Sequence, residues 1–174
     1  YGTHFAFRQK GTISGVVVFQ AGINGAYLRG NNLTVRNSTI AYSAGSAMSI
    51  VGSNNTVDNS FIHDFGYMGG GVSGVYFKGS GNSLTHSTIS RSGRSLVDLT
   101  ECANCKLIHN LLYSAAILTT DNGAIYAFGK DLQNTEIAYN WIRVFESGRP
   151  TWLTLGIYLD LSLIHISEPT RRTP

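Results

Sequence analysis

A six-residue phrase occurs five times between residues 35 and 142, and it limits the folds open to this chain more than any other feature. The phrase begins with an aliphatic residue, carries a small polar or ring side chain at its third position, and ends in Ile or Leu. The copies are residues 35–40, 57–62, 84–89, 107–112 and 137–142. Their first residues are 22, 27, 23 and 30 positions apart, an interval at which one repeat usually forms one unit of a solenoid.

A second phrase runs in step with the first, so each repeat is expected to contain at least two short strands. Its copies are residues 47–50, 74–77, 95–98, 124–128 and 156–160, with clusters of Gly, Asn and Ser between the phrases. Such runs predict strands and turns. No window of a dozen residues keeps apolar side chains at helical spacing, and the Leu-x-x-Leu-x-Leu phrase of leucine-rich repeats is missing. The prediction is an all-β chain, a parallel β-helix of about five to six rungs.

Stacking of rungs at about 4.8 Å turns each position of the repeat into a column of side chains. The last position of the first phrase predicts an internal aliphatic column of Ile40, Ile62, Ile89, Leu112 and Ile142. The third position holds Asn37 and Asn59, followed by His86, His109 and Tyr139. Stacked asparagines can form an amide ladder. We expect the two histidines to stack as rings in this column rather than to act in catalysis.

The composition indicates neither a nucleic-acid partner nor a membrane partner. Only 13% of the residues are charged and the net charge is +3, with Lys and Arg scattered along the chain. No basic stripe is present for nucleic acid, and no apolar run is long enough to span a bilayer.

Cys102 and Cys105 form a single C-x-x-C pair. A structural zinc site of the ribbon kind needs a second pair of Cys or His at suitable spacing, and none follows. A thioredoxin-type motif needs a helix after a strand, which this context does not offer. We expect two thiols in a turn between strands, oxidised or not, and no metal site.

Both ends of the chain are expected to be incomplete. It begins at Tyr1, so the true N-terminus and any signal peptide are expected to lie outside the sequence. From Leu161 the regularly spaced Gly and Asn turn residues stop, and the sequence resembles the translation of a sequencing adapter. The expected organisation is a β-helix fragment over residues 1–160, truncated at both ends, followed by a non-native tail over residues 161–174.

Three segments in the second half carry a family resemblance: Asp-Asn-Gly-Ala-Ile-Tyr at 121–126, Thr-Glu-Ile-Ala-Tyr-Asn-Trp at 135–141, and Gly-Ile-Tyr-Leu-Asp at 156–160. With these, the chain resembles secreted right-handed parallel β-helix proteins of the carbohydrate-active, pectate-lyase-like kind over about residues 25–160. The resemblance implies an extracellular or periplasmic enzyme that acts on a polysaccharide or oligosaccharide, either a glycoside hydrolase or a lyase.

Hydrolysis of a glycosidic bond requires two carboxyl groups, and we expect Asp121, Asp160 and Asp98 to supply them. Aligning Ile125 with Ile157 puts Asp160 level with Phe128, seven positions along the strand from Asp121. That offset is too large for a pair on a straight strand. The pair therefore requires a bend at Asn122-Gly123, which such a dipeptide readily permits. Asp98 is the alternative partner, two rungs from Asp160 and within one or two positions of its column.

The expected sugar-binding residues are Tyr126, Tyr158, Trp141, Arg94, Lys78 and His109. Aromatic side chains offer an apolar face to a sugar ring and a polar group to its hydroxyls. The hydrolase is predicted to need no cofactor.

Two other interpretations remain open. In a polysaccharide lyase, Lys78, Arg91 or Arg94 would be the base, and Asp98 and Glu101 could bind Ca²⁺. A non-enzymatic adhesin or glycan-binding stalk of the same fold is the third interpretation. The insertions at 66–73, 115–122 and 146–155 favour an enzyme, because loops on a rigid scaffold commonly carry function. The sequence does not predict an oligomeric state.

Overall fold

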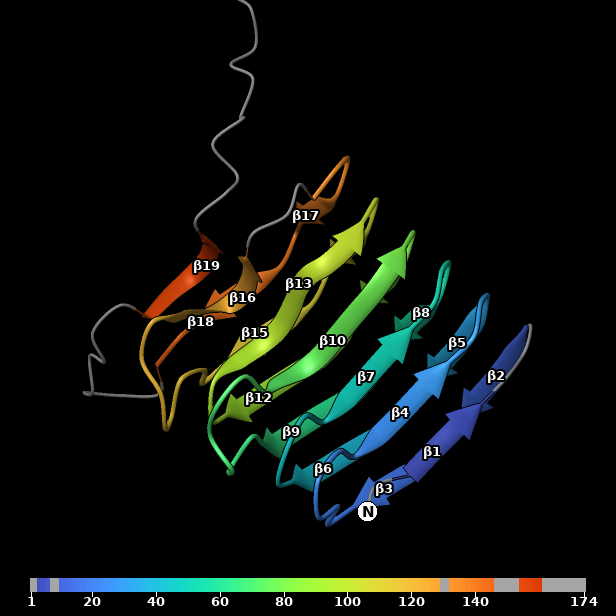
Figure 1. Ribbon diagram of the computed structural model, residues 1–174, viewed down its shortest axis with the longest axis horizontal. Coiled ribbons are helices and arrows are strands. Elements are labelled where there is room, and N and C mark those ends of the chain that lie inside the picture. Colours follow the sequence, from blue (N-terminus) through green and yellow to red (C-terminus); the bar gives the residue numbers. More distant parts are fainter. Residues whose placement is uncertain (1–2, 7–9, 129–131, 146–153, 161–174) are drawn as a thin grey trace, which may run out of the picture.

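The chain forms a β-solenoid of three parallel sheets, shown in a computed structural model that describes residues 3–6, 10–128, 132–145 and 154–160. The tail expected at 161–174 lies outside the described residues. Every third strand along the sequence joins the same sheet, so the chain coils around an axis (Figure 1). All strand pairs in the described ranges are parallel, and these ranges contain no helix. The all-β parallel β-helix predicted from the repeats is confirmed.

The strands fall into sheets that we name A, B and C. Sheet A consists of β1 (Thr3–Ala6), β4 (Ala26–Arg29), β7 (Met48–Val51), β10 (Ser73–Ser80), β13 (Ser95–Ala103), β16 (Asn122–Phe128) and β19 (Thr154–Asp160). Sheet B consists of β2 (Gly11–Ser14), β5 (Leu33–Arg36), β8 (Thr56–Asp58), β11 (Ser83–Thr85), β14 (Lys106–Ile108) and β17 (Glu136–Ala138). Sheet C consists of β3 (Val17–Phe19), β6 (Thr39–Ser43), β9 (Phe61–Phe65), β12 (Thr88–Ser92), β15 (Leu111–Tyr113) and β18 (Trp141–Arg143).

Each copy of the first sequence phrase contains the end of one strand and the start of another. The third position has a left-handed backbone in all five copies, with φ between +43° at Asn59 and +60° at His109. Such a residue turns the chain from sheet B into sheet C, and asparagine tolerates the conformation better than most residues do. Each repeat therefore contains three strands, one more than the minimum of two expected from the phrases.

The predicted columns are present inside and outside the solenoid. Ile40, Ile62, Ile89, Leu112 and Ile142 pair in register across sheet C, and the first four are buried. On the outside, Asn59 donates a hydrogen bond from Nδ2 to Oδ1 of Asn37 at 2.8 Å. The rings of His86, His109 and Tyr139 follow, stacked at centroid distances of 5.5 and 5.0 Å. The amide ladder and the ring stack are both confirmed.

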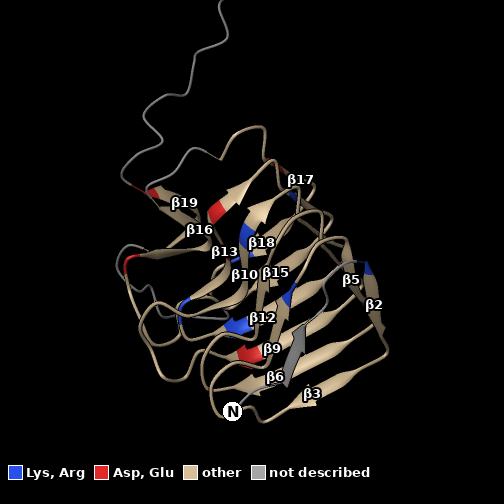
Figure 2. Cartoon of the chain, turned by 45° about the vertical axis from the view of Figure 1, so that its right-hand side comes forward, with Lys and Arg blue, Asp and Glu red and all other residues tan. Residues whose placement is uncertain are grey.

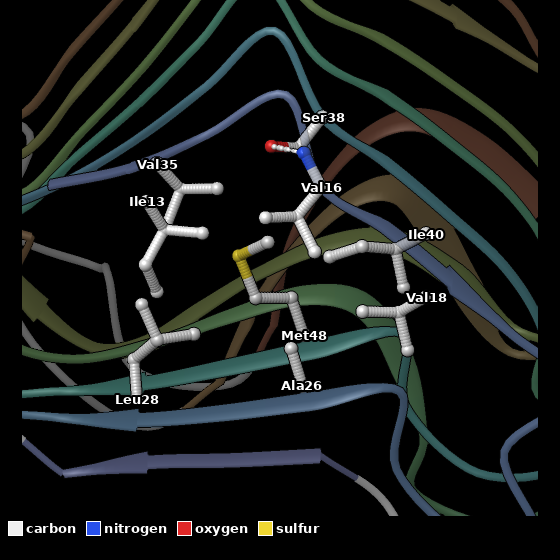
Figure 3. A pocket seen from close by; sticks show the side chains of 9 residues that line it. All are labelled: Ile13, Val16, Val18, Ala26, Leu28, Val35, Ser38, Ile40 and Met48. Carbon is white, nitrogen blue, oxygen red and sulfur yellow. Dashed lines mark hydrogen bonds between the residues drawn. The ribbon is translucent and has the colours of Figure 1, made fainter.

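The interior of the first coils is apolar. A hollow there is lined by Ile13, Val16, Val18, Ala26, Leu28, Val35, Ser38, Ile40 and Met48 (Figure 3). Its one hydroxyl, on Ser38, accepts a hydrogen bond from the backbone N–H of Val16 at 3.2 Å. The hollow belongs to the core and offers no unpaired polar group to a ligand.

Cys102 and Cys105 form a disulfide at the turn from β13 to β14, and both residues are buried in the core. The two thiols, expected oxidised or not, are oxidised in this structure. The described part of the chain includes no helix long and apolar enough to cross a lipid bilayer.

Candidate functional site

The outer face of sheet A carries a column of polar and aromatic side chains. Tyr76, Asp98, Tyr126 and Tyr158 occupy the same register position in four successive strands. The residues on either side of them in β10, β13 and β16 are buried in the core, and side chains alternate between the two faces of a strand. The side chains of the column therefore point outward, and the column runs along the axis of the solenoid.

Asp160 and Tyr126 meet near the C-terminal end of this column. Asp160 pairs in register with Phe128, as the repeat alignment predicts. The hydroxyl of Tyr126 donates a hydrogen bond to Oδ2 of Asp160 at 3.0 Å. Burial, followed by this bond and the charge of Asp160, raises the pKa of Tyr126 above its ordinary value. The tyrosine thus stays a neutral donor to the carboxylate at physiological pH.

Asp121 and Asp160 both act on the hydroxyl of Tyr158. The pKa of Tyr158 is raised, first by partial desolvation, then by the negative charges of Asp121 and Asp160 and by hydrogen bonding to both. The rings of Tyr126 and Tyr158 lie edge to face with centroids 5.7 Å apart. The charges of two of the three predicted carboxylates therefore act on Tyr158, whose ring packs against the tyrosine that binds Asp160.

A bend at the start of β16 brings Asp121 to this position. Asp121 has a left-handed backbone with φ +56°. The buried Asn122 anchors the turn, because its Nδ2 donates to Oγ1 of Thr119 at 3.2 Å. A Cβ on Gly123 would lie 2.8 Å from the backbone nitrogen of Tyr158, so only glycine allows this approach. The bend therefore lies at Asp121 and not at Asn122-Gly123 as expected, because Asn122 and Gly123 already belong to β16 and pair with Thr154 and Leu155.

Arg94 lies over Tyr126 on the same face. Its guanidinium carbon is 4.8 Å from the centroid of the Tyr126 ring, within the range of a cation–π interaction. Among the described residues, no carboxylate forms an ion pair with Arg94. The arginine can therefore offer its hydrogen-bond donors to a ligand beside the two aspartates.

Lys78 lies on the same face, in a neighbouring group with Tyr76 and Glu101. The hydroxyl of Tyr76 donates to Oε1 of Glu101 at 2.8 Å, and Nζ of Lys78 is 2.6 Å from Oε2. Burial, followed by the hydrogen bond to Glu101 and the charges of Glu101 and Asp98, raises the pKa of Tyr76. An ammonium group in an ion pair has no lone pair to accept a proton, which argues against Lys78 as the base of a lyase.

Asp98 lies between these two groups but is less accessible than the other predicted carboxylates. Its Oδ1 accepts a hydrogen bond from the backbone N–H of Thr100 at 2.8 Å, and the residue is buried. Asp121 is exposed and Asp160 is half-buried. The accessible pair is therefore Asp121 with Asp160.

Two predicted sugar-binding residues lie on other faces. Trp141 is in β18 of sheet C, where the guanidinium of Arg143 is 5.7 Å from its ring centroid. His109 lies in the ring stack at the turn from sheet B to sheet C. Both residues belong to the first sequence phrase, whose strands do not enter sheet A.

Sequence reasoning missed a charged cluster on sheet C. Asp64 in β9 binds Arg91 in the adjacent β12, and Figure 2 shows the acidic and basic segments on these neighbouring strands. Arg91, considered above as a lyase base, is held by this carboxylate. His63 and Tyr67 also contact Asp64. The signal was available, because Asp64 and Arg91 are 27 positions apart, the same interval as Val57 and Leu84.

The described ranges contain no group of three or more His, Cys, Asp or Glu that could hold a metal ion. Both carboxylate oxygens of Glu101, considered above as a Ca²⁺ ligand, are engaged by Tyr76 and Lys78.

Comparison with solved structures shows a likeness to one described as pectate lyase Pel9A, with a TM-score of 0.56 and 17% sequence identity. The match covers 87% of this chain and 52% of that one, so the chain spans about half the length of that protein. At this identity the likeness concerns the fold alone. No curated protein matches the chain. A family model described as "Right handed beta helix region" matches residues 4–149. The chain therefore belongs to the right-handed β-helix family.

Proposed function

We propose that the chain is part of a glycan-degrading enzyme, a glycoside hydrolase whose site lies on the outer face of sheet A. The observation that carries the proposal is that Asp160 accepts a hydrogen bond from Tyr126, whose ring packs against Tyr158 in the same column. The negative charges of Asp121 and Asp160 both contribute to the raised pKa of Tyr158. Paired carboxylates on an open face are the minimum that glycosidic hydrolysis requires.

We assign the two carboxylates the roles of a retaining reaction, in which one is the nucleophile and the other is the general acid and base. Asp160, which accepts the hydrogen bond from Tyr126, suits the nucleophile, because the bond stabilises a carboxylate. Asp121 on its exposed turn suits the general acid and base.

Aromatic and cationic groups beside the pair support binding of a sugar chain. The half-buried Tyr158 offers part of its ring, and Arg94, which lies over the buried ring of Tyr126, offers donors to hydroxyl or carboxylate groups of the ligand. The column continues toward Tyr76 along the axis, so a chain-like substrate could extend over several coils. An extracellular or periplasmic location is supported by the Cys102–Cys105 disulfide, since such bonds persist in oxidising compartments.

A polysaccharide lyase of the same fold is the second candidate. It is favoured by the likeness to pectate lyase Pel9A and by the cation of Arg94 beside the column. A Ca²⁺-dependent form is supported less well, because Glu101 is already engaged. A non-enzymatic glycan-binding stalk remains the third candidate.

The test compares Asp121→Asn and Asp160→Asn with the parent chain on plant, algal and host glycans. Reducing-end release measures hydrolysis, and absorbance of unsaturated products measures elimination. We expect hydrolysis, lowered by about 10²-fold or more in each variant, with Asp58→Asn as a control carboxylate on sheet B. Unsaturated products would establish the lyase instead. Binding without cleavage of any glycan would establish the stalk.

A further inference from the structure

The cluster on sheet C combines charged groups with exposed aromatic rings. Nδ1 of His63 is 2.6 Å from Oδ2 of Asp64, and the hydroxyl of Tyr67 donates to Oδ1 at 3.0 Å. Nε of Arg91 donates to the same Oδ1 at 2.8 Å, and its Nη2 contacts Oδ2. Asp64 is therefore held on both carboxylate oxygens, which explains why its pKa lies well below the usual range, chiefly through Arg91.

The backbone turns these polar groups outward. Asp64 and Arg91 both have left-handed conformations with φ +55°. His63 precedes Asp64, and the next residue, Phe65, is fully buried. Asp64 thus interrupts the alternation of side chains between the inner and outer faces of the strand. His63 and Asp64 therefore both lie on the outer face.

Two aromatic rings flank the imidazole, and a third extends the row of rings into a further coil. Phe61 stacks on His63 with centroids 4.1 Å apart, and Tyr42 meets the imidazole edge to face at 5.8 Å. Phe19 meets Tyr42 at 4.8 Å. All three rings reach solvent, with exposed fractions of 57% for Phe19, 44% for Tyr42 and 38% for Phe61.

The charges of the cluster cancel, and this determines the ligand that fits. The carboxylate of Asp64 is neutralised by Arg91, so the cluster presents no net charge to a cation or an anion. What it presents is ring surface and oriented polar atoms. Nδ1 of His63 lies 2.6 Å from Oδ2 of Asp64 and 3.0 Å from Nη2 of Arg91, so Nε2 is the ring nitrogen that remains for a ligand. No described residue bonds Nε2.

We propose that Phe19, Tyr42, Phe61, His63 and Tyr67 form a second glycan-binding surface, for uncharged sugar rings, on the outer face of sheet C. A sugar ring combines an apolar face, which packs on aromatic rings, with hydroxyls, which bond to oriented groups such as Nε2 and the Tyr67 oxygen. The surface would hold the protein on a polysaccharide, and it does not depend on cleavage at sheet A.

The test is affinity gel electrophoresis in gels containing galactan, arabinoxylan or mixed-linkage β-glucan, with polygalacturonate as the acidic comparator. We expect at least one neutral polysaccharide to retard the parent chain. Phe61→Ala should weaken the retardation at least tenfold. Phe19→Ala, at a more exposed position, is the second variant should Phe61→Ala fold poorly. Tyr139→Ala removes an exposed ring from the turn between sheets B and C and is the matched control, together with Asp160→Asn.

Four outcomes would overturn the surface. The first two are that no neutral polysaccharide retards the parent chain, or that polygalacturonate alone does so. The third is that Tyr139→Ala loses as much retardation as Phe61→Ala does. The fourth is that folded Phe61→Ala or Phe19→Ala still binds as the parent chain does. Sedimentation provides a further check, because a dimer that dissociates in Phe61→Ala would assign the rings to contact between copies of the chain. If Asp160→Asn loses binding while Phe61→Ala keeps it, the glycan binds at sheet A and not at sheet C.

Discussion

Asp64 shows how one residue can join neighbouring coils. It accepts hydrogen bonds from the described side chains of His63, Tyr67 and Arg91, and Arg91 belongs to the next coil of sheet C. Its side chain is only 12% exposed. Interactions of a charged group in such a position depend on its ionisation, so they respond to pH.

Asp64→Asn is expected to lower stability at neutral pH and to flatten its dependence on acid. The folded-state pKa of Asp64 is below the unfolded value near 4. Its contribution is therefore present above that value and lost as pH falls through the folded pKa. We expect a loss of about 1–3 kcal/mol at pH 7. In thermal unfolding from pH 5 to pH 2, the melting temperature of the parent chain should fall more than that of the variant. Parallel curves would contradict the argument.

The same cluster gives an alkaline response. Burial, followed by the hydrogen bond to Asp64, raises the pKa of Tyr67 to about 12. The neutral hydroxyl therefore contributes stability below the unfolded pKa near 10, and this contribution is lost as pH rises toward 12. Tyr67→Phe should melt with a smaller dependence on pH above 9 than the parent chain does.

Gly123→Ala is expected to disturb the candidate site through its backbone. The added Cβ would lie 2.6 Å from the carbonyl oxygen of Ile125 and 2.8 Å from the nitrogen of Tyr158. We expect a loss of about 1–3 kcal/mol in thermal unfolding and reduced glycan cleavage. Gly71→Ala is the matched control, because nothing lies within 4 Å of its added Cβ. If the two variants have equal stability and equal glycan cleavage, the close approach at Gly123 does not position Asp121.

The turns between sheets B and C carry a second, buried ladder that joins the coils. Its members occupy the fourth position of the first phrase: Ser38, Ser60, Ser87, Asn110 and Asn140. Each backbone N–H from Ser38 to Asn110 donates to the side-chain oxygen of the next member. The strands of these turns are short, so the ladder supplies bonds between coils where the sheets are interrupted.

Asn110→Ala is expected to cost about 2–3 kcal/mol, because it leaves buried polar groups without partners. The variant removes the acceptor for the N–H of Ser87 and the donor to the carbonyl of Leu84. Asn110→Ser should be milder, since serine fills this position in earlier coils. Asn59→Gly, on the exposed ladder and at φ +43°, should change stability by no more than about 0.5 kcal/mol. Chemical denaturation measures all three, and an equal cost in Asn59→Gly would contradict the ladder.

The repeats predict the strands and their register well, but they predict less well on which sheet each candidate site residue lies. The phrase intervals predict the coil and the register, including Asp160 level with Phe128. The phrases predict at least two strands in each repeat and do not mark the third, because a single left-handed residue at Asn37 or His86 leaves the apolar pattern unchanged. Trp141 and His109 lie away from sheet A because their phrase belongs to sheets B and C. The position of Asp121 depends on a backbone contact of Gly123 that no local pattern encodes.

In the assembled solenoid, each coil packs only on its neighbours, so burial varies along the axis. Val75 and Phe77 in β10 are fully buried. In β19, the last described strand, the equivalent Ile157 and Leu159 have exposed fractions of 44% and 42%. The candidate site uses Tyr158 and Asp160 from this less covered strand. Stability and the geometry of the site are therefore coupled along the axis.

Hydrogen exchange should follow this gradient. Amides of β19 are expected to exchange at least about tenfold faster than those of β10, because local opening there exposes little additional apolar surface.

Side-chain truncation gives an independent readout of the same gradient. Leu99→Ala, at a fully buried position, should lower the free energy of unfolding by about 2–5 kcal/mol. Leu159→Ala should cost about 1 kcal/mol or less, because its side chain is already partly in water. Mass spectrometry of exchanged peptides and chemical denaturation measure the two effects. Equal protection of β10 and β19, with equal costs for the two leucines, would mean that the described coils unfold as one cooperative unit.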